Sequence, residues 1–350
     1  MENKKARKSS LDIIKILATF VIIFHHYQQV LNVEYRTGIN FYGEQFNFGY
    51  FVELFFILSG FFMYRYINKI RNGISFADFF KKRYLRLIPV LIFGTILYQA
   101  IAYVYFRITG SLWGGHGFSL WSTVITCFGV QDGWVFTNPM INNPVWYISV
   151  LILCYIFFYL TTWLATKFNT NEYCLYITMI LIGIGIHTYK INLPFFNFDA
   201  ARGYYSFFTG IICANIFYNL KEKKNYIVVS FFAVIIISSL YIIAPNFVNG
   251  GSNWILTFIL FPALVYLFFR IKKIPGDKII IALSEISYCT YVIHLPFIIC
   301  ISILQIVKPE LIPSFNSKTL MILFSLICFL FGALIHYVYE KPIAKRIRKL

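Results

Sequence analysis

The apolar stretches of this chain constrain its fold more than any other feature of the sequence. A membrane-spanning helix needs about 20 predominantly apolar residues, and about ten stretches approach or exceed that length. Backbone groups inside a bilayer have to pair within their own segment, which favours helices. We therefore predict an all-α, polytopic integral membrane protein that forms one domain over residues 1–350. The expected spans are 11–31, 48–67, 85–106, 144–166, 173–190, 203–220, 226–244, 253–270, 279–305 and 318–339.

The composition agrees with this class of protein. Hydrophobic residues make up 59% of the chain and charged residues only 13%, whereas a soluble domain is about half apolar and a quarter charged. The net charge of +17 does not indicate nucleic-acid binding, because the basic residues lie between apolar runs and serve as topology signals and contacts for anionic lipid or ligand. The sequence shows no fused soluble domain, and segment 120–130 is too short for a span, so we expect it at the surface or re-entrant.

The distribution of basic residues predicts the orientation. With ten spans, 24 of the 31 Lys and Arg fall on the side of the N-terminus, six fall on the other side and Lys15 lies within the first span. Basic residues concentrate in cytoplasmic loops, so both termini should be cytoplasmic. The first apolar run is too long for a signal peptide and is read as a retained span of a multi-pass protein in the bacterial plasma membrane.

The first span carries ionisable residues, which are expensive at membrane depth. Lys15 and His26 lie eleven positions apart, so they fall within roughly 20° of the same helix face and about 16 Å apart along the axis. Asp12 lies near that face, while His25 points about 100° away. This polar stripe indicates a path into the bilayer. The alternative is that Lys15 extends to the membrane surface and His26 bonds a neighbouring helix.

Glu53 lies about five residues inside the outer end of the second span, at a depth similar to that of His26. A carboxylate beside an imidazole would fix its tautomer and favour its basic form. We therefore expect Glu53 to support His26 or to pair with another buried base, unless burial keeps it neutral.

The loop after the second span predicts an anion site. Arg83 and Arg86 share a helix face just before Pro89, and two guanidinium groups suit a phosphorylated ligand. In the ninth span, Tyr291 and His294 lie on one face and are candidate site residues; simple interhelical hydrogen bonding is the alternative.

The long segment 107–143 is expected on the outer side and is a candidate for binding a sugar. Trp113 and His116 lie in it, and Trp146 follows it, among glycine and asparagine residues that suit stacking and hydrogen bonding to a carbohydrate. The alternative is an interfacial aromatic belt. The seven cysteines show no ligand-like spacing, so neither a disulfide framework nor a metal site is indicated.

Together these motifs resemble the membrane acyltransferase-3 family, the cell-surface glycan O-acetyltransferases, over nearly the whole chain. Lys15 stands where this family has arginine, and WYISVLI at 146–152 lacks the family's acidic residue. The matching pieces are Lys15 and His26; Glu53 with LFFILSG at 54–60; Arg83, Arg86 and Pro89; Ser287, Tyr288, Tyr291 and His294; and Glu340, Lys341 and Pro342.

The resemblance implies an O-acetyltransferase that moves an acetyl or other short acyl group from cytoplasmic acyl-CoA, with acetyl-CoA as donor substrate and no permanently bound cofactor. The acceptor would be a hydroxyl of a cell-surface or lipid-linked glycan. By resemblance, His26 would be the catalytic histidine, and Arg83 and Arg86 would bind the CoA. From the residues themselves we add Glu53 and His294 as catalytic candidates and Lys15 as a further contact for the CoA. The substrate-binding candidates are Trp113, His116, Trp146 and Tyr291.

Buried ionisable groups and interrupted helices also occur in transporters. A transporter or flippase of an anionic or sugar substrate is therefore the alternative function. The lipid bilayer, the acyl-CoA and the glycan are the expected partners, nucleic acid is not expected, and the sequence is compatible with a homodimer.

Overall fold

The computed structural model describes residues 9–35, 39–43, 48–115, 118–134, 141–220, 224–243, 254–271 and 274–347. All regular elements within these ranges are helices, apart from one isolated bridge between Leu193 and Phe196. Each of the ten predicted spans coincides with a helix or a helix pair. The protein is therefore an all-α, polytopic membrane protein, as the sequence predicts.

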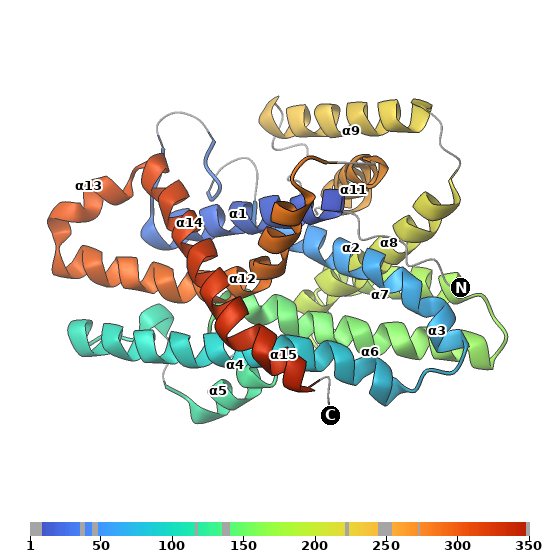
Figure 1. Ribbon diagram of the computed structural model, residues 1–350, viewed down its shortest axis with the longest axis horizontal. Coiled ribbons are helices and arrows are strands. Elements are labelled where there is room, and N and C mark those ends of the chain that lie inside the picture. Colours follow the sequence, from blue (N-terminus) through green and yellow to red (C-terminus); the bar gives the residue numbers. More distant parts are fainter. Residues whose placement is uncertain are drawn as a thin grey trace.

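Several long helices, among them α1, α4, α6 and α9, run roughly along the long axis of the molecule, whereas α14 crosses it obliquely; α9 lies at one flank and α4 and α5 at the opposite flank (Figure 1). The helices are α1 (Ser9–Leu31), α2 (Phe51–Met63), α3 (Ile67–Arg71), α4 (Phe76–Thr109), α5 (Leu120–Cys127), α6 (Trp146–Lys167), α7 (Glu172–Tyr189), α8 (Phe198–Asn219), α9 (Lys224–Ile243), α11 (Phe261–Arg270), α12 (Asp277–Val307), α13 (Ile312–Phe315), α14 (Lys318–Ile335) and α15 (Lys341–Ile347). Short 3₁₀ segments η1 (Phe48–Tyr50), η2 (Tyr64–Tyr66), η3 (Trp113–Gly115), η4 (Asn143–Val145) and η6 (Pro309–Leu311), and π-helical turns η5 (Leu256–Leu260) and η7 (His336–Glu340), extend or link them.

Seven helical segments among the described residues are long and apolar enough to cross a membrane. The remaining three predicted spans correspond to α8, α9 and the η5–α11 segment. The apolar helices Asn225–Leu240 and Leu256–Arg270 are shorter than a full span, and α8 contains Asp199 and Arg202. Segment 120–130 forms the eight-residue helix α5, whose Trp121 is largely exposed.

Local sequence signals set several helix ends. Ser75, Asn171 and Asn197 cap α4, α7 and α8 by accepting hydrogen bonds from backbone N–H groups in the first turn, which satisfies donors that a helix start leaves unpaired. Gly110 ends α4 in the left-handed conformation that glycine adopts without steric cost. These signals explain why α4 begins well before the apolar run that predicts it.

Two glycines allow α2 and α8 to pack backbone against backbone. A Cβ on Gly60 would overlap the carbonyl oxygen of Phe207, and a Cβ on Gly210 would overlap that of Ile57. Small residues at such crossings let membrane helices approach closely. This contact holds Glu53 of α2 beside the start of α8.

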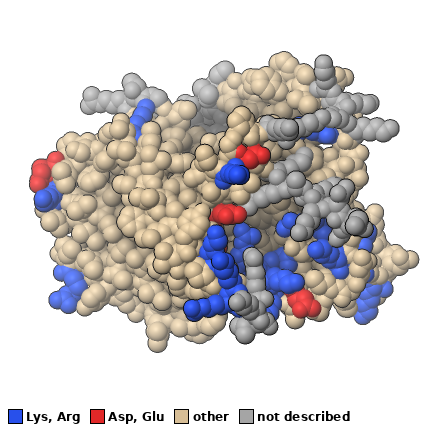
Figure 2. Space-filling model, viewed as in Figure 1, with Lys and Arg blue, Asp and Glu red and all other residues tan. Residues whose placement is uncertain are grey.

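Lys and Arg gather at one end of the bundle, around α3 and α15 (Figure 2). We call this the basic end; α4 begins there. The sequence predicts that it faces the cytoplasm, because positively charged loops remain on that side.

Candidate functional site

Two histidines meet inside the bundle, one from α1 and one from α12. These helices run side by side in the same direction: Ser9 Oγ donates to Asp277 at 2.7 Å and Ser284 Oγ donates to Asp12 at 2.6 Å near their starts. Farther along, His26 Nδ1 lies 3.1 Å from His294 Nε2. His294 is fully buried, whereas His26 keeps some exposed surface.

The hydrogen bonds around this pair assign its tautomers. His294 Nδ1 lies within hydrogen-bond distance of the Tyr291 carbonyl oxygen, which can only accept, so Nδ1 carries the proton. In the neutral ring, His294 Nε2 is then an acceptor. His26 Nδ1 faces this nitrogen and also the Ile22 carbonyl oxygen at 3.0 Å, so it carries a proton as well. The chain Tyr291–His294–His26 leaves His26 Nε2 unprotonated and able to act as a base.

Aromatic side chains from three helices surround the pair. The ring of Tyr291 lies 5.6 Å from that of His294 and 5.9 Å from those of Phe55 and Tyr147. The Tyr291 hydroxyl donates to the Pro144 carbonyl oxygen. The sequence analysis selects Tyr291 as a substrate ligand, but its hydroxyl is already used to hold η4. The Tyr147 hydroxyl instead shares a 3.0 Å hydrogen bond with Ser59.

Glu53 pairs with Arg202 rather than with His26. Arg202 donates to both carboxylate oxygens, from Nε at 2.6 Å and from a terminal nitrogen at 3.1 Å. The side chain of Glu53 is fully buried and that of Arg202 is 13% exposed. The guanidinium carbon of Arg202 lies 4.6 Å from the centre of the Trp146 ring, a cation–π distance. The sequence suggests either His26 or another buried base as the partner of Glu53. In the described residues the partner is a buried basic residue, Arg202.

Arg202 and Asn142 belong to this site and are missed by the sequence analysis. Arg202 lies one residue before the predicted span 203–220, so it counts as a loop charge. The sequence feature that could have identified Arg202 is its place, together with Asp199, at the start of an apolar run. Asn142 is fully buried and donates to the Val292 carbonyl oxygen of α12 at 3.0 Å; nothing in the sequence distinguishes it.

Lys15 lies nearer the basic end on the same helix as His26. Its ammonium group is 3.5 Å from Asp12 and 4.7 Å from the centre of the Phe62 ring. The side chain is 29% exposed. The stripe of Asp12, Lys15 and His26 predicted from the sequence is therefore present on α1, with its polar contacts directed toward α12 and α2.

Arg83 and Arg86 lie in the first turns of α4 but in different environments. The Arg83 guanidinium is stacked between the rings of Tyr66 and Phe79, at 3.9 and 3.7 Å from their centres, and it donates to Met63 Sδ and to the Phe79 carbonyl oxygen. Its Nη2 is buried without a hydrogen-bond partner, and no acidic residue pairs with it in the described part of the chain. Arg86 is exposed. A fixed buried cation beside an exposed one is suited to an anionic ligand.

The remaining substrate-binding candidates do not join this site in the described residues. Trp113 packs edge-on against Tyr105, at 5.1 Å between ring centres, near the end of α4. His116 lies outside the described residues.

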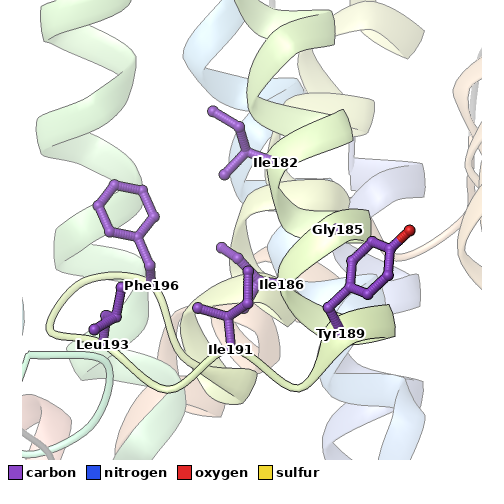
Figure 3. Close-up of a pocket in the computed structure, with 7 residues that line it drawn as sticks. All are labelled: Ile182, Gly185, Ile186, Tyr189, Ile191, Leu193 and Phe196. Carbon is purple, nitrogen blue, oxygen red and sulfur yellow. The ribbon is translucent and has the colours of Figure 1, made fainter.

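A cavity of about 390 Å³ lies elsewhere, at the end of α7. Figure 3 shows its walls, which include Ile182, Ile186 and Phe196. The lining is apolar apart from the Tyr189 hydroxyl, so it offers no acid or base for catalysis.

The chain was compared with known proteins. The model of the acyltransferase-3 family, described as an acyltransferase domain, matches residues 8–338. This match includes both histidines, the Glu53–Arg202 pair and the two arginines of α4. No curated protein and no solved structure matches the chain.

Proposed function

The chain belongs to the acyltransferase-3 family and is a membrane acyltransferase, and from this premise we propose that it moves an acetyl or other short acyl group from acyl-CoA to a hydroxyl of a cell-surface or lipid-linked glycan. The observation that carries the proposal is the hydrogen-bonded chain Tyr291–His294–His26. It orients one imidazole with a free basic nitrogen, which is what acyl transfer to a hydroxyl requires.

The donor would enter from the basic end, which we place in the cytoplasm. CoA carries several phosphate groups, and Arg83 with its unpaired Nη2 and the exposed Arg86 would bind them. Lys15 lies eleven residues before His26 on α1, beside Phe62 of α2, and Arg83 donates to the next residue, Met63. The thioester would therefore extend along α1 toward the imidazole while the charged part of CoA remains at the membrane surface.

In the proposed reaction, His26 Nε2 accepts the proton of the acceptor hydroxyl while the oxygen attacks the thioester carbonyl. The tetrahedral intermediate then collapses, the carbon–sulfur bond breaks, and the CoA thiolate takes the proton from His26. His26 carries a positive charge between these steps, and His294 Nε2 stabilises it by accepting a hydrogen bond from the Nδ1–H group of His26. A transient acyl group on His26 Nε2 is the second route to the same products.

The test uses the purified full-length protein in liposomes with radiolabelled acetyl-CoA and glycolipid extracted from source cells that lack the gene. We expect alkali-labile label on the glycan, and its loss in His26→Ala. His187→Gln is the matched control, because His187 also lies on a membrane helix but contacts Phe198 and Trp254 instead of a second histidine. Undiminished labelling by His26→Ala would contradict the mechanism. Transfer of unmodified glycan across the vesicles without labelling would favour a transporter.

A further inference from the structure

A second group of reactive side chains lies on the basic side of the histidine pair. Cys289 of α12 donates its thiol to Glu340 Oε2 at 3.2 Å, and His336 Nδ1 lies 2.6 Å from the same oxygen. All three residues are buried, and one ligand atom from each lies within 4.8 Å of the others. We call this group the Cys289–His336–Glu340 cluster. Cys289 lies between Tyr288 and Tyr291 in the stretch of α12 that leads to His294, but none of the three residues of the cluster has been assigned a role in acyl transfer.

The cluster leaves hydrogen-bonding capacity unused in either protonation state of His336. With a neutral ring, Nδ1 donates to Glu340 and the lone pair of Nε2 is buried; with a charged ring, an N–H donor is buried at the same atom. In both cases Nε2 has no hydrogen-bond partner in the described residues. An ion bound at Nδ1 would keep the ring neutral with its proton on Nε2.

Within the described residues, the cation that lies beside Glu340 is His336, and only when its ring is protonated. A buried carboxylate is costly unless a cation or a full set of donors neutralises it, and within the described ranges Glu340 pairs with no Lys or Arg. A divalent ion bound to a cysteine thiolate, a glutamate carboxylate and a neutral histidine gives a site with no net charge. Each of the three side chains would then bind the ion, whereas Cys289 and His336 now both contact Oε2 of Glu340.

We propose that the Cys289–His336–Glu340 cluster is a binding site for a divalent metal ion of borderline softness, with zinc as the ion it suits best. Sulfur, imidazole nitrogen and carboxylate oxygen are the three ligand types that zinc takes, at about 2.0–2.3 Å. Tetrahedral coordination at those lengths separates ligand atoms by about 3.3–3.6 Å. The thiol–carboxylate distance of 3.2 Å is already close to this range, and the imidazole–carboxylate distance of 2.6 Å has to widen by less than 1 Å.

The position of the cluster indicates what the ion would do. Cys289 lies on α12 five residues before His294, and His336 and Glu340 begin and end the π-helical turn η7 between α14 and α15. Tyr288 donates to the Leu87 carbonyl oxygen of α4, and the ring of Tyr339 packs at a tilt against that of Phe93 on the same helix, 5.4 Å between centres. A metal ion would therefore fasten η7 to α12 where both meet α4, and would fix the helix that carries His294.

The π-turn itself supports this reading. π-helical turns occur mostly as single bulges at functional sites, and here the turn brings His336 and Glu340, four residues apart, onto one carboxylate–imidazole contact. The cysteine spacings in the sequence do not indicate this site because Cys289 and His336 lie 47 positions apart. Metal-ligand spacings are recognised only when the ligands lie close in the chain.

The test measures metal bound to the full-length protein, purified in detergent through a tag that contains no histidine. After incubation with zinc chloride and gel filtration, we expect about one zinc per chain by mass spectrometry of the metal. Cys289→Ser and His336→Gln should lower the bound zinc at least about tenfold. Cys328→Ser, a buried cysteine on α14, and His187→Gln are the matched controls and should retain it.

A second readout separates coordination from folding. Cobalt bound through a thiolate absorbs in the near ultraviolet, so the cobalt-loaded protein should show this band and Cys289→Ser should lack it. Zinc should raise the thermal unfolding temperature of the unmodified protein and leave that of His336→Gln unchanged. The proposal is wrong if the unmodified protein retains no zinc or cobalt, or if Cys289→Ser and His336→Gln retain as much as the controls. If Cys289→Ser does not fold, Glu340→Gln provides the same comparison.

Discussion

Replacing His294 tests whether it acts on the reaction through His26. The substitution His294→Phe keeps a planar ring of similar size but removes the nitrogen that lies 3.1 Å from His26 Nδ1. His26 would keep its hydrogen bond to the Ile22 carbonyl oxygen, so the ring stays in place. What the variant loses is the acceptor that stabilises the charged form of His26 during proton transfer.

The size of the effect follows from that one hydrogen bond. In the resting state both rings are neutral, and the bond contributes about 0.5–1.5 kcal/mol. When His26 becomes an imidazolium, the bond joins a charged donor to a neutral acceptor and contributes about 1.5–3 kcal/mol. Because the resting-state bond is lost as well, turnover falls only by the difference between the two contributions, about 1–1.5 kcal/mol, or about 5–13-fold at 1.36 kcal/mol per factor of ten. Removal of the base itself in His26→Ala should cost more, up to about 10⁴-fold.

The assay is acyl transfer by the purified protein in liposomes, with the maximal rate and the Michaelis constant for acetyl-CoA measured across pH. We expect the rate to fall and the Michaelis constant to change little. His294→Gln, which offers an amide oxygen to His26 Nδ1, should recover part of the rate. The tautomer argument is refuted if His294→Phe keeps the full rate, or if His294→Gln is no better than His294→Phe although both are folded.

Four further predictions follow from the described contacts. Arg86→Gln should raise the Michaelis constant for acetyl-CoA about 10–100-fold with little change in turnover, the loss expected for a charge-assisted hydrogen bond; an unchanged constant would remove Arg86 from the donor site. Glu53→Gln leaves the buried Arg202 unpaired and should lower the free energy of unfolding, measured in a detergent unfolding titration, by about 3–5 kcal/mol. The double variant Glu53→Leu with Arg202→Met should be closer in stability to the unmodified protein, and an equal loss in both variants would contradict this account. Gly60→Ala should destabilise the fold because its Cβ meets the Phe207 carbonyl oxygen, while Gly185→Ala on α7, which has open space around it, should stay within about 1 kcal/mol of the unmodified protein. Thermal unfolding measures the difference, and equal stability of the two variants would rule out the close α2–α8 contact. Burial, and to a smaller extent the nearby Asp199 carboxylate, raises the pKa of Asp132 to about 8. The free energy of unfolding should therefore fall as pH rises from about 4 toward 8, by at most about 1.4 kcal/mol per pH unit, and should level off above pH 8. Asp132→Asn should flatten this dependence, and a slope that persists in that variant would assign it to other groups.

The helices were predictable from the sequence, and the two places where a helix begins well before the predicted span that it contains are informative. The predicted spans 85–106 and 203–220 begin after charged residues, whereas α4 begins at Phe76 and α8 at Phe198. Hydropathy treats every charge as a boundary because a lone charge in lipid is costly. It has no information about whether a charge is paired or stacked inside the protein, as Arg202 and Arg83 are.

The polar stripe of α1 was likewise predictable, because the helical period fixes which residues share a face. Its partners were not, since they lie on helices far away in the chain. Nothing in the sequence indicates that α1 and α12 lie in parallel contact, which brings His26 to His294. The direction of the Tyr291 hydroxyl toward Pro144 also depends on packing that no local pattern encodes.

The charge balance of the interior gives these contacts a common logic. Glu53 is neutralised by Arg202, and Asp12 lies beside Lys15, whereas the histidine chain is neutral until a proton moves. A carboxylate partner for His26 would place a permanent charge beside the reacting groups in a medium where unpaired charge is costly. A second histidine supplies the same orientation and acquires charge only in the step that needs stabilising. Arg83 is the exception among these groups, because its guanidinium is buried without an acidic partner in the described residues and is stacked between the rings of Tyr66 and Phe79 instead.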